Sequence, residues 1–201
     1  MQFIGTLKKN AAVLVAVALW ISAVGFGIRT LWQYADTPGR AATTPAIWPA
    51  DTLVGRAPGR ATLVIFAHPH CPCSRATIGE LARVMARCRE KVDVSVWFYA
   101  PSQEPDNWPK TELWRRAAAI PGVRVFADSD GRQARRFGAS TSGQALLYDS
   151  GGRLAFNGGI TALRGHSGDN EGRDAIISLV HGETPMRRST PVFGCSLSRE
   201  E

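Results

Sequence analysis

A chain of 201 residues has room for one ordinary domain and an appendage, and its hydrophobic content of 44% is that of a folded domain rather than a disordered one. The formal net charge of +7 would suit nucleic acid, but the basic residues are scattered and no recognition motif accompanies them, so nucleic acid is not expected as a partner. Four cysteines are too few for a disulfide-held scaffold of this size.

The first predicted element is a transmembrane helix over residues 11–31. The uncharged run from Ala11 to Ile28 spans about 27 Å as a helix, close to the hydrocarbon core of about 30 Å. Lys8 and Lys9 precede it, which predicts a cytoplasmic N-terminus over residues 1–10 and places the remainder outside the cytoplasm. We therefore expect a single-pass protein of the inner or plasma membrane. A cleaved signal peptide is the alternative, although no clear Ala-x-Ala site follows.

Residues 32–60 are rich in Pro, Gly, Ala and Thr, a composition typical of a semi-extended linker. The folded domain is expected over residues 61–182, with an entry segment that starts near residue 46. Residues 183–201 are then a C-terminal tail. This organisation sets one domain outside the membrane, joined to the apolar helix by a spacer.

The domain begins with a continuous apolar run, residues 62–67, that is typical of a strand buried on both faces. Residues 78–88 then place their apolar side chains, including Cys88, on one face of a helix. The later elements are predicted at residues 92–99 (strand), 112–119 (helix), 123–126 (strand), 128–138 (capped helix), 145–148 with 154–156 (hairpin), and 171–180 (helix capped by Asp169 or Asn170). The order β-α-β-α-β-α-β-β-α predicts an α/β fold with a mixed sheet and helices on both faces.

The sequence His68-Pro69-His70-Cys71-Pro72-Cys73-Ser74 lies between the buried strand and the first helix of the domain. Free N–H groups and the positive end of a helix dipole favour a thiolate at such a position. The neighbouring His70 would lower the pKa of Cys71 further. Two cysteines in a Cys-x-Cys arrangement at this point indicate redox or metal chemistry.

A strand that ends in Phe66-Ala67, a cysteine motif that opens a helix, and a closing hairpin plus helix resemble the thioredoxin-like superfamily. The apolar N-terminus narrows the resemblance to the membrane-anchored TlpA/ResA type of thiol-disulfide protein, over roughly residues 46–182. The resemblance implies a thioredoxin-like mixed sheet and a thiol-disulfide oxidoreductase that requires no cofactor. It also implies protein thiols or disulfides outside the cytoplasm as partners, and is compatible with an electron donor in the membrane.

The motif departs from the family pattern of Cys-x-x-Cys. An ungapped alignment places Cys71 at the attacking position and Ser74 at the resolving position, so that Cys73 is an extra thiol. Ser142-Gly143 stands where the family has a cis-proline facing the cysteines. The substrate class and the direction of exchange are therefore left open.

We expect Cys71 to attack a substrate disulfide and Cys73, by preference, to release the mixed disulfide. Cys195 in the tail is the alternative resolving thiol. Ser74, His70 and His166 are candidates for tuning the site, and the loop that holds His166 also places Arg164 near the cysteines or a partner. Cys88 lies on the apolar face of its helix and is expected in the core.

Two other functions compete with thiol-disulfide exchange. Thiolate and imidazole side chains together suit copper or zinc, and the candidate ligands are His68, His70, Cys71 and Cys73. This alternative resembles the Sco-type copper chaperones, which use Cys-x-x-x-Cys with a distant histidine. In this chain the motif is Cys-x-Cys, and His166 is the candidate for the distant histidine. The third reading is a non-catalytic interaction module that retains only the fold.

Overall fold

The computed structural model describes residues 2–40, 43–56, 58–88 and 90–197. It divides into two units, which are considered separately: the helix α1 (Gln2–Asp36) and a compact unit from Thr37 onward. Within α1, the 26 residues from Ala11 to Asp36 are long and apolar enough to cross a bilayer, a criterion that a signal sequence also meets. The apolar helix predicted over residues 11–31 is present and extends further in both directions.

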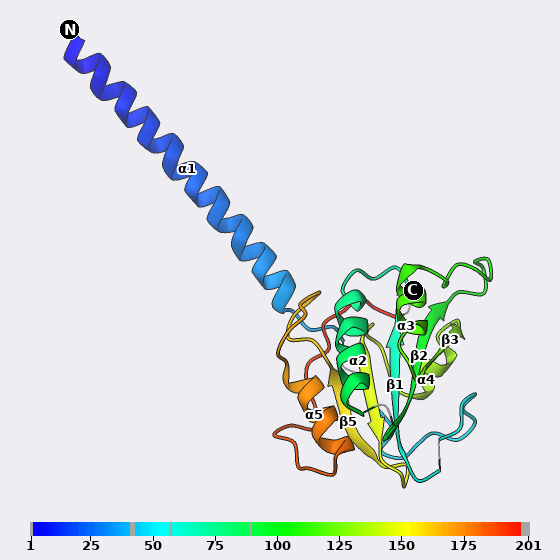
Figure 1. The fold of residues 1–201 in the computed structure, drawn as a ribbon. Helices are drawn as coiled ribbons and strands as arrows, with labels where there is room; N and C mark the ends of the chain where they lie inside the picture. Colours follow the sequence, from blue (N-terminus) through cyan, green and yellow to red (C-terminus); the bar gives the residue numbers. More distant parts are fainter. Residues whose placement is uncertain (1, 41–42, 57, 89, 198–201) are drawn as a thin grey trace. The chain divides into compact units, whose positions relative to one another are not determined.

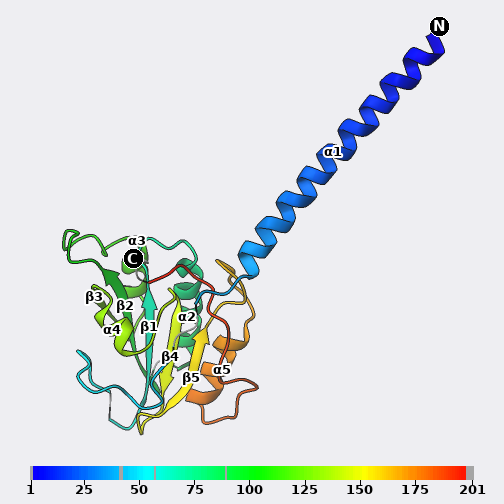
Figure 2. The same ribbon diagram turned by 180° about the vertical axis from the view of Figure 1, so that it is seen from behind.

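A five-stranded sheet forms the centre of the compact unit (Figure 1). Its spatial order is β3-β2-β1-β4-β5. The strands are β1 (Ala61–Ala67), β2 (Val92–Ala100), β3 (Val123–Ser129), β4 (Gln144–Tyr148) and β5 (Leu154–Gly159). The first three are parallel, whereas β4 runs antiparallel to β1 and forms a hairpin with β5, as Figure 2 shows from behind. The mixed sheet predicted from the sequence is confirmed.

The helices are α2 (Ser74–Cys88), α3 (Glu112–Ala118), α4 (Arg132–Arg136) and α5 (Glu171–Val180). One face of the sheet packs against α2, α3 and α5 in a core that includes Leu63, Leu81 and Ile176. On the other face, Val64 and Phe66 pack with Phe137, which follows α4. Because both faces are covered, β1 is buried along its length after Ala61, as its apolar run predicts.

Residues 43–54, which include the entry segment expected from about residue 46, pack on the rest of the compact unit. The Trp48 ring packs edge-on against Phe137 and Tyr148, with centroids 5.0 and 5.1 Å away. The Tyr148 hydroxyl donates to the Pro45 carbonyl at 3.1 Å. This segment covers apolar side chains on the same face of the sheet as the short α4.

The described part of the C-terminal tail, residues 183–197, also packs on the domain. Gly39 N–H donates to the Val192 carbonyl at 2.8 Å, and Thr190 Oγ1 donates to the Gly159 carbonyl at 2.7 Å. Leu197 is buried in the same core as Phe66. The compact unit therefore starts at Thr37 and includes the described part of the tail.

Candidate active site

The cysteine motif occupies the connection between β1 and α2. The turn closes through Cys71 N–H to the His68 carbonyl at 3.1 Å and Ser74 N–H to the Cys71 carbonyl at 3.2 Å. The helix begins at Ser74, directly after Cys73, as the sequence predicts. Cys71 is 4% exposed and Cys73 is 7% exposed, so both thiols lie under a cover of protein.

Cys195 contacts Cys71, and the side chain of Cys73 also hydrogen-bonds with Cys71. Their Sγ atoms are 2.8 Å apart, within hydrogen-bonding distance for sulfur. The tail is held there by backbone pairing with the loop before β4, because Ser142 N–H donates to the Cys195 carbonyl at 2.8 Å and Leu197 N–H donates to the Ser140 carbonyl at 2.9 Å. The structure thus brings together the predicted nucleophile and the thiol that the sequence offers as the alternative resolver.

Gly194 lets the tail approach this loop. A Cβ atom at Gly194 would lie 1.9 Å from the Ser142 carbonyl oxygen, a distance that no side chain tolerates. Glycine is therefore required where the tail passes the loop, one residue before Cys195. In the sequence, this close approach is marked only by the Gly194-Cys195 pair. The sequence does not indicate that Ser142 is the residue that Gly194 approaches.

Ser142 and Gly143 join the motif to the sheet. The Ser142 hydroxyl accepts from His68 N–H at 2.7 Å and lies 2.6 Å from the Ser74 hydroxyl. Gly143 has φ of +93°, and its N–H donates to the Phe66 carbonyl at 2.7 Å. The described residues contain no cis peptide bond. Ser74 is thus buried in a hydrogen-bonded link between the start of α2 and this loop.

The three thiols of the site differ in acidity. Burial raises the pKa of the Cys71 thiol, but hydrogen bonds from Cys195 and Ser74 outweigh burial, so that the pKa of Cys71 is lowered. Burial, with the hydrogen bond to Cys71 and its charge, raises the pKa of Cys195 to about 12. Burial and the charge of Cys71 also raise the pKa of Cys73. Cys71 is therefore the favoured thiolate, with Cys195 as a hydrogen-bond donor to it.

The histidines of the motif pack with aromatic side chains. His68 Nδ1 accepts from His70 N–H at 3.2 Å, and its ring stacks on Tyr99 at 5.8 Å between centroids. Trp108 meets the rings of His68 and His70 at 5.6 and 4.5 Å. Burial, together with the charge of His70, lowers the pKa of His68. These contacts define an aromatic cluster of His68, His70, Tyr99 and Trp108 beside the thiols.

The candidate metal ligands of the sequence are two histidines and two cysteines of the motif, with His166 as a distant histidine. Across the described part of the chain, no group of three or more His, Cys, Asp or Glu side chains is placed to hold an ion. His166 is exposed, and its ring lies next to Gly168. Binding of copper by His68, His70, Cys71 and Cys73 stays a prediction.

An open groove of about 250 Å³ lies beside Cys71. The motif contributes His70 and Pro72, and α3 with its preceding residue contributes Thr111, Glu112 and Arg116. Thr111 Oγ1 donates to the Pro69 carbonyl at 3.1 Å, which ties the two walls together. The groove gives a substrate a route to the otherwise buried Cys71.

Comparison with solved structures supports the fold. The chain is similar to an uncharacterized conserved protein from Geobacillus kaustophilus, with 19% identity, a TM-score of 0.59 and coverage of 82% of this chain and 93% of that one. It is also similar to a hypothetical protein from Sinorhizobium meliloti 1021, with 22% identity, a TM-score of 0.56 and coverage of 80% and 93%.

A more distant similarity is to a secreted Mycobacterium tuberculosis disulfide oxidoreductase homologous to E. coli DsbE, with 15% identity, a TM-score of 0.44 and coverage of 62% and 83%. No protein-family model matches the sequence, and no curated protein matches it. The fold is thioredoxin-like, a mixed five-stranded sheet with flanking helices, and it is accompanied by one N-terminal apolar helix, as predicted.

Proposed function

We propose that this protein is a thiol-disulfide oxidoreductase whose exchanging pair is Cys71 and Cys195. The observation that carries the proposal is the 2.8 Å contact between their Sγ atoms, in which Cys71 is the thiol whose pKa is lowered. A thiolate within reach of a second thiol is the arrangement that disulfide exchange requires.

In the reducing direction, the Cys71 thiolate attacks one sulfur of a substrate disulfide. The substrate S–S bond breaks, a mixed disulfide forms on Cys71, and the first substrate thiolate leaves. Cys195, after it loses its proton, attacks Sγ of Cys71 and displaces the second substrate thiolate. Two electrons pass from the protein dithiol to the substrate, and the thiolates released take up two protons. The reverse sequence oxidises a substrate dithiol.

The sequence favours Cys73 as the partner of Cys71. The arrangement of the site makes Cys195 the better partner. A Cys71–Cys73 disulfide would close a ring within the turn that also makes the hydrogen bond from Ser74 N–H to the Cys71 carbonyl. Cys195 instead approaches from a separate segment that has its own backbone hydrogen bonds. The Cys71–Cys195 bond therefore needs only a small movement of two side chains, whereas the other bond would strain the turn.

The apolar part of α1 supports a location at the membrane. We propose that Ala11–Asp36 anchors the protein in the inner or plasma membrane, with the domain outside the cytoplasm, because Lys8 and Lys9 precede the span. Protein thiols or disulfides in that compartment would be the partners, and a membrane electron donor would restore the active redox state. A reporter fused after Glu201 tests this topology, since an export-dependent reporter would be active and a strictly cytoplasmic one would be silent.

Mass spectrometry of the full chain, purified in detergent and mildly oxidised, tests the pair directly. The expected result is a cross-linked peptide that joins Cys71 to Cys195, with Cys88 unlinked. A Cys71–Cys73 link would overturn the choice of partner. The native mass of the same preparation after anaerobic addition of Cu(I) reports on the copper alternative, and uptake of one ion that depends on His70 would favour it. A chain with neither a link nor an ion would be a non-catalytic module.

A further inference from the structure

The loop between β5 and α5 places a guanidinium against the segment that holds Cys195. Arg164 Nη1 donates to the Gly194 carbonyl at 2.6 Å, and Arg164 Nε donates to the Thr37 carbonyl at 3.2 Å. Gly194 directly precedes Cys195. Arg164 therefore ties the resolving thiol's own backbone to the loop and to the first residue of the compact unit.

The two peptide groups on either side of the Cys195 Cα are each held by a hydrogen bond from a different segment. The carbonyl of Gly194 accepts from Arg164, and the carbonyl of Cys195 accepts from Ser142 N–H. Two consecutive carbonyls fixed by two separate elements leave little freedom for the Cys195 side chain. Contact with Cys71 depends on this clamp, because the tail has no helix or strand of its own at this point.

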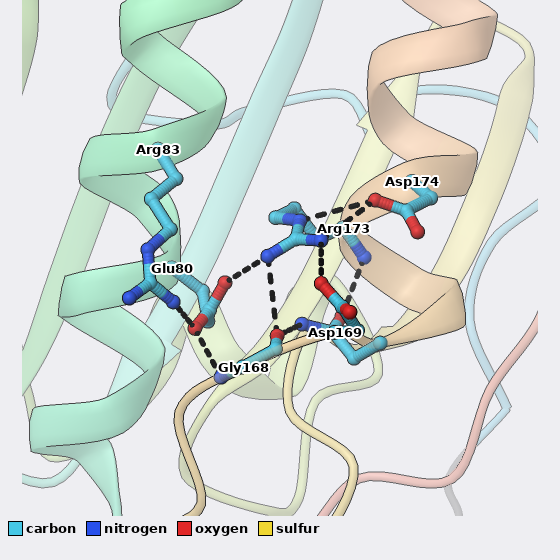
Figure 3. Close-up of polar contacts among 7 residues, drawn as sticks. Glu80, Arg83, Gly168, Asp169, Arg173 and Asp174 are labelled. Carbon is cyan, nitrogen blue, oxygen red and sulfur yellow. Dashed lines mark hydrogen bonds and ion pairs between the residues drawn. The ribbon is translucent and has the colours of Figure 1, made fainter.

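The loop itself is tied to α2, the helix that the cysteine motif opens (Figure 3). Gly168 N–H donates to Glu80 Oε1 at 2.9 Å, while the Gly168 carbonyl accepts from Arg173 Nη1 at 3.1 Å. Arg173 Nη1 also pairs with Glu80 Oε2 at 3.0 Å, and Glu80 is fully buried. These three residues form a clasp between α2, the loop and α5. The base of the loop that carries Arg164 is thus fixed to the same helix that positions Cys71.

The charge of Arg164 also acts on the thiols. Burial raises the pKa of Cys195 and of Cys73. Arg164 opposes this effect by its charge at Cys195, and by its charge and a side-chain hydrogen bond at Cys73. A buried thiolate needs a nearby cation or hydrogen-bond donor. The thiols of Cys71 and Cys73 act in the opposite sense and raise the pKa of Cys195.

We propose that Arg164 is a positioning residue of the exchange reaction, which holds Cys195 against Cys71 and stabilises the Cys195 thiolate. The proposal rests on the function proposed above. When Cys195 attacks the mixed disulfide on Cys71, the guanidinium favours the attacking thiolate. When an incoming thiolate attacks Sγ of Cys71 in the oxidised protein, the S–S electron pair leaves on Cys195 Sγ, where the same charge receives it. Arg164 thus serves both directions of exchange.

A single-turnover experiment tests this role. The full chain with Cys73→Ser is converted at Cys71 to the mixed disulfide with thionitrobenzoate, and release of the coloured thiolate by Cys195 is followed across pH. Arg164→Gln should slow release about tenfold, the scale of one lost charge-assisted hydrogen bond, and should move the pH midpoint of the rate upward. Arg164→Lys should restore the midpoint and part of the rate. Arg132→Gln, at an exposed arginine on α4, is the control for loss of one positive charge.

Circular dichroism shows whether each variant is folded. If Arg164→Gln does not fold, Arg164→Lys is used in its place. An Arg164→Gln rate and midpoint equal to those of the parent would overturn the proposal. A slower rate with an unmoved midpoint and no rescue by lysine would also overturn it, since that pattern is purely structural. Cys195→Ser distinguishes the two proposals: if it releases thionitrobenzoate at the parent rate, the Cys71–Cys195 pair itself is wrong.

Discussion

The Sγ atoms of Cys71 and Cys195 lie 2.8 Å apart although 124 positions separate the two residues in the chain. The thiol that we propose as the exchange partner of Cys71 therefore comes from the tail. Formation of a Cys71–Cys195 bond would fasten the tail to the domain, and reduction would leave the tail held by hydrogen bonds alone. The chemistry of the site is thus coupled to the packing of residues 189–197.

The acidity of Cys71 gives a first prediction. Because hydrogen bonds from Cys195 and Ser74 outweigh the effect of burial, the pKa of Cys71 is lowered, and its thiolate persists at a lower pH than an ordinary thiol. In the reduced chain, iodoacetamide should label Cys71 before Cys195, whose pKa is about 12. Cys195→Ala should shift the labelling profile of Cys71 to higher pH. Peptide mass spectrometry across pH measures both, and a profile unmoved by Cys195→Ala would contradict the hydrogen bond.

A second prediction concerns Gly194. The added Cβ of Gly194→Ala would lie 1.9 Å from the Ser142 carbonyl oxygen, so the tail must move away from the loop. We expect the free energy of unfolding to fall by about 1–3 kcal/mol and the Cys71–Cys195 link to form more slowly. Gly55→Ala is the matched control, because a Cβ there meets no atom within 4 Å. Equal rates of link formation in both variants would show that the close approach is unimportant.

Glu80 gives a third prediction, on stability. Glu80→Gln removes the buried carboxylate that pairs with Arg173, while Arg173 keeps its ion pairs with Asp169 and Asp174. Loss of one member of a buried pair costs about 3–5 kcal/mol when the remaining charge is uncompensated, so with two pairs left we expect a loss of about 1–3 kcal/mol. Urea denaturation of the full chain in detergent should show this loss. The control is Glu112→Gln, which breaks two exposed ion pairs and should cost less than about 1 kcal/mol. Similar losses for the two variants would contradict a buried clasp.

A fourth prediction follows from His68. Burial, and then the charge of His70, lowers the pKa of His68, so the unfolded chain binds a proton more readily than the folded one. Stability should therefore fall as the pH is lowered from about 6.5, the ordinary histidine pKa, toward the lower pKa of the folded state. His68→Gln should flatten this dependence in melting curves taken from pH 8 to 5. The control is His181→Gln, at an exposed histidine outside the site, which should leave the pH dependence of stability as it is in the parent. If the pH dependence survives His68→Gln, His68 is not its cause.

The sequence predicts the parts of the fold that local pattern determines. The run from Thr62 to Ala67 is apolar at almost every position because both faces of β1 are covered. Asn170 caps α5, as expected, by accepting from Arg173 N–H at 2.7 Å. In each case the signal lies within a few residues of the element, so a short window contains it.

The arrangement of Cys195 and Trp48 depends on contacts across the chain. Trp48 lies in a segment whose composition is typical of a linker, yet its ring packs on Phe137 and Tyr148. Cys195 is placed by backbone hydrogen bonds to Ser142 and by the guanidinium of Arg164 on Gly194. Backbone pairing of this kind leaves no periodic pattern in either segment, which is why the sequence favours the nearer Cys73.

The most direct test of the central claim is a mixed-disulfide trap. The full chain and its Cys71→Ser, Cys73→Ser and Cys195→Ser variants are each incubated with a peptide that contains one disulfide, then resolved on non-reducing gels and identified by mass spectrometry. We predict that Cys195→Ser accumulates the peptide on Cys71, that Cys73→Ser continues to turn over, and that Cys71→Ser traps nothing. Accumulation in Cys73→Ser with continued turnover in Cys195→Ser would contradict the assignment of Cys195 as the resolving thiol.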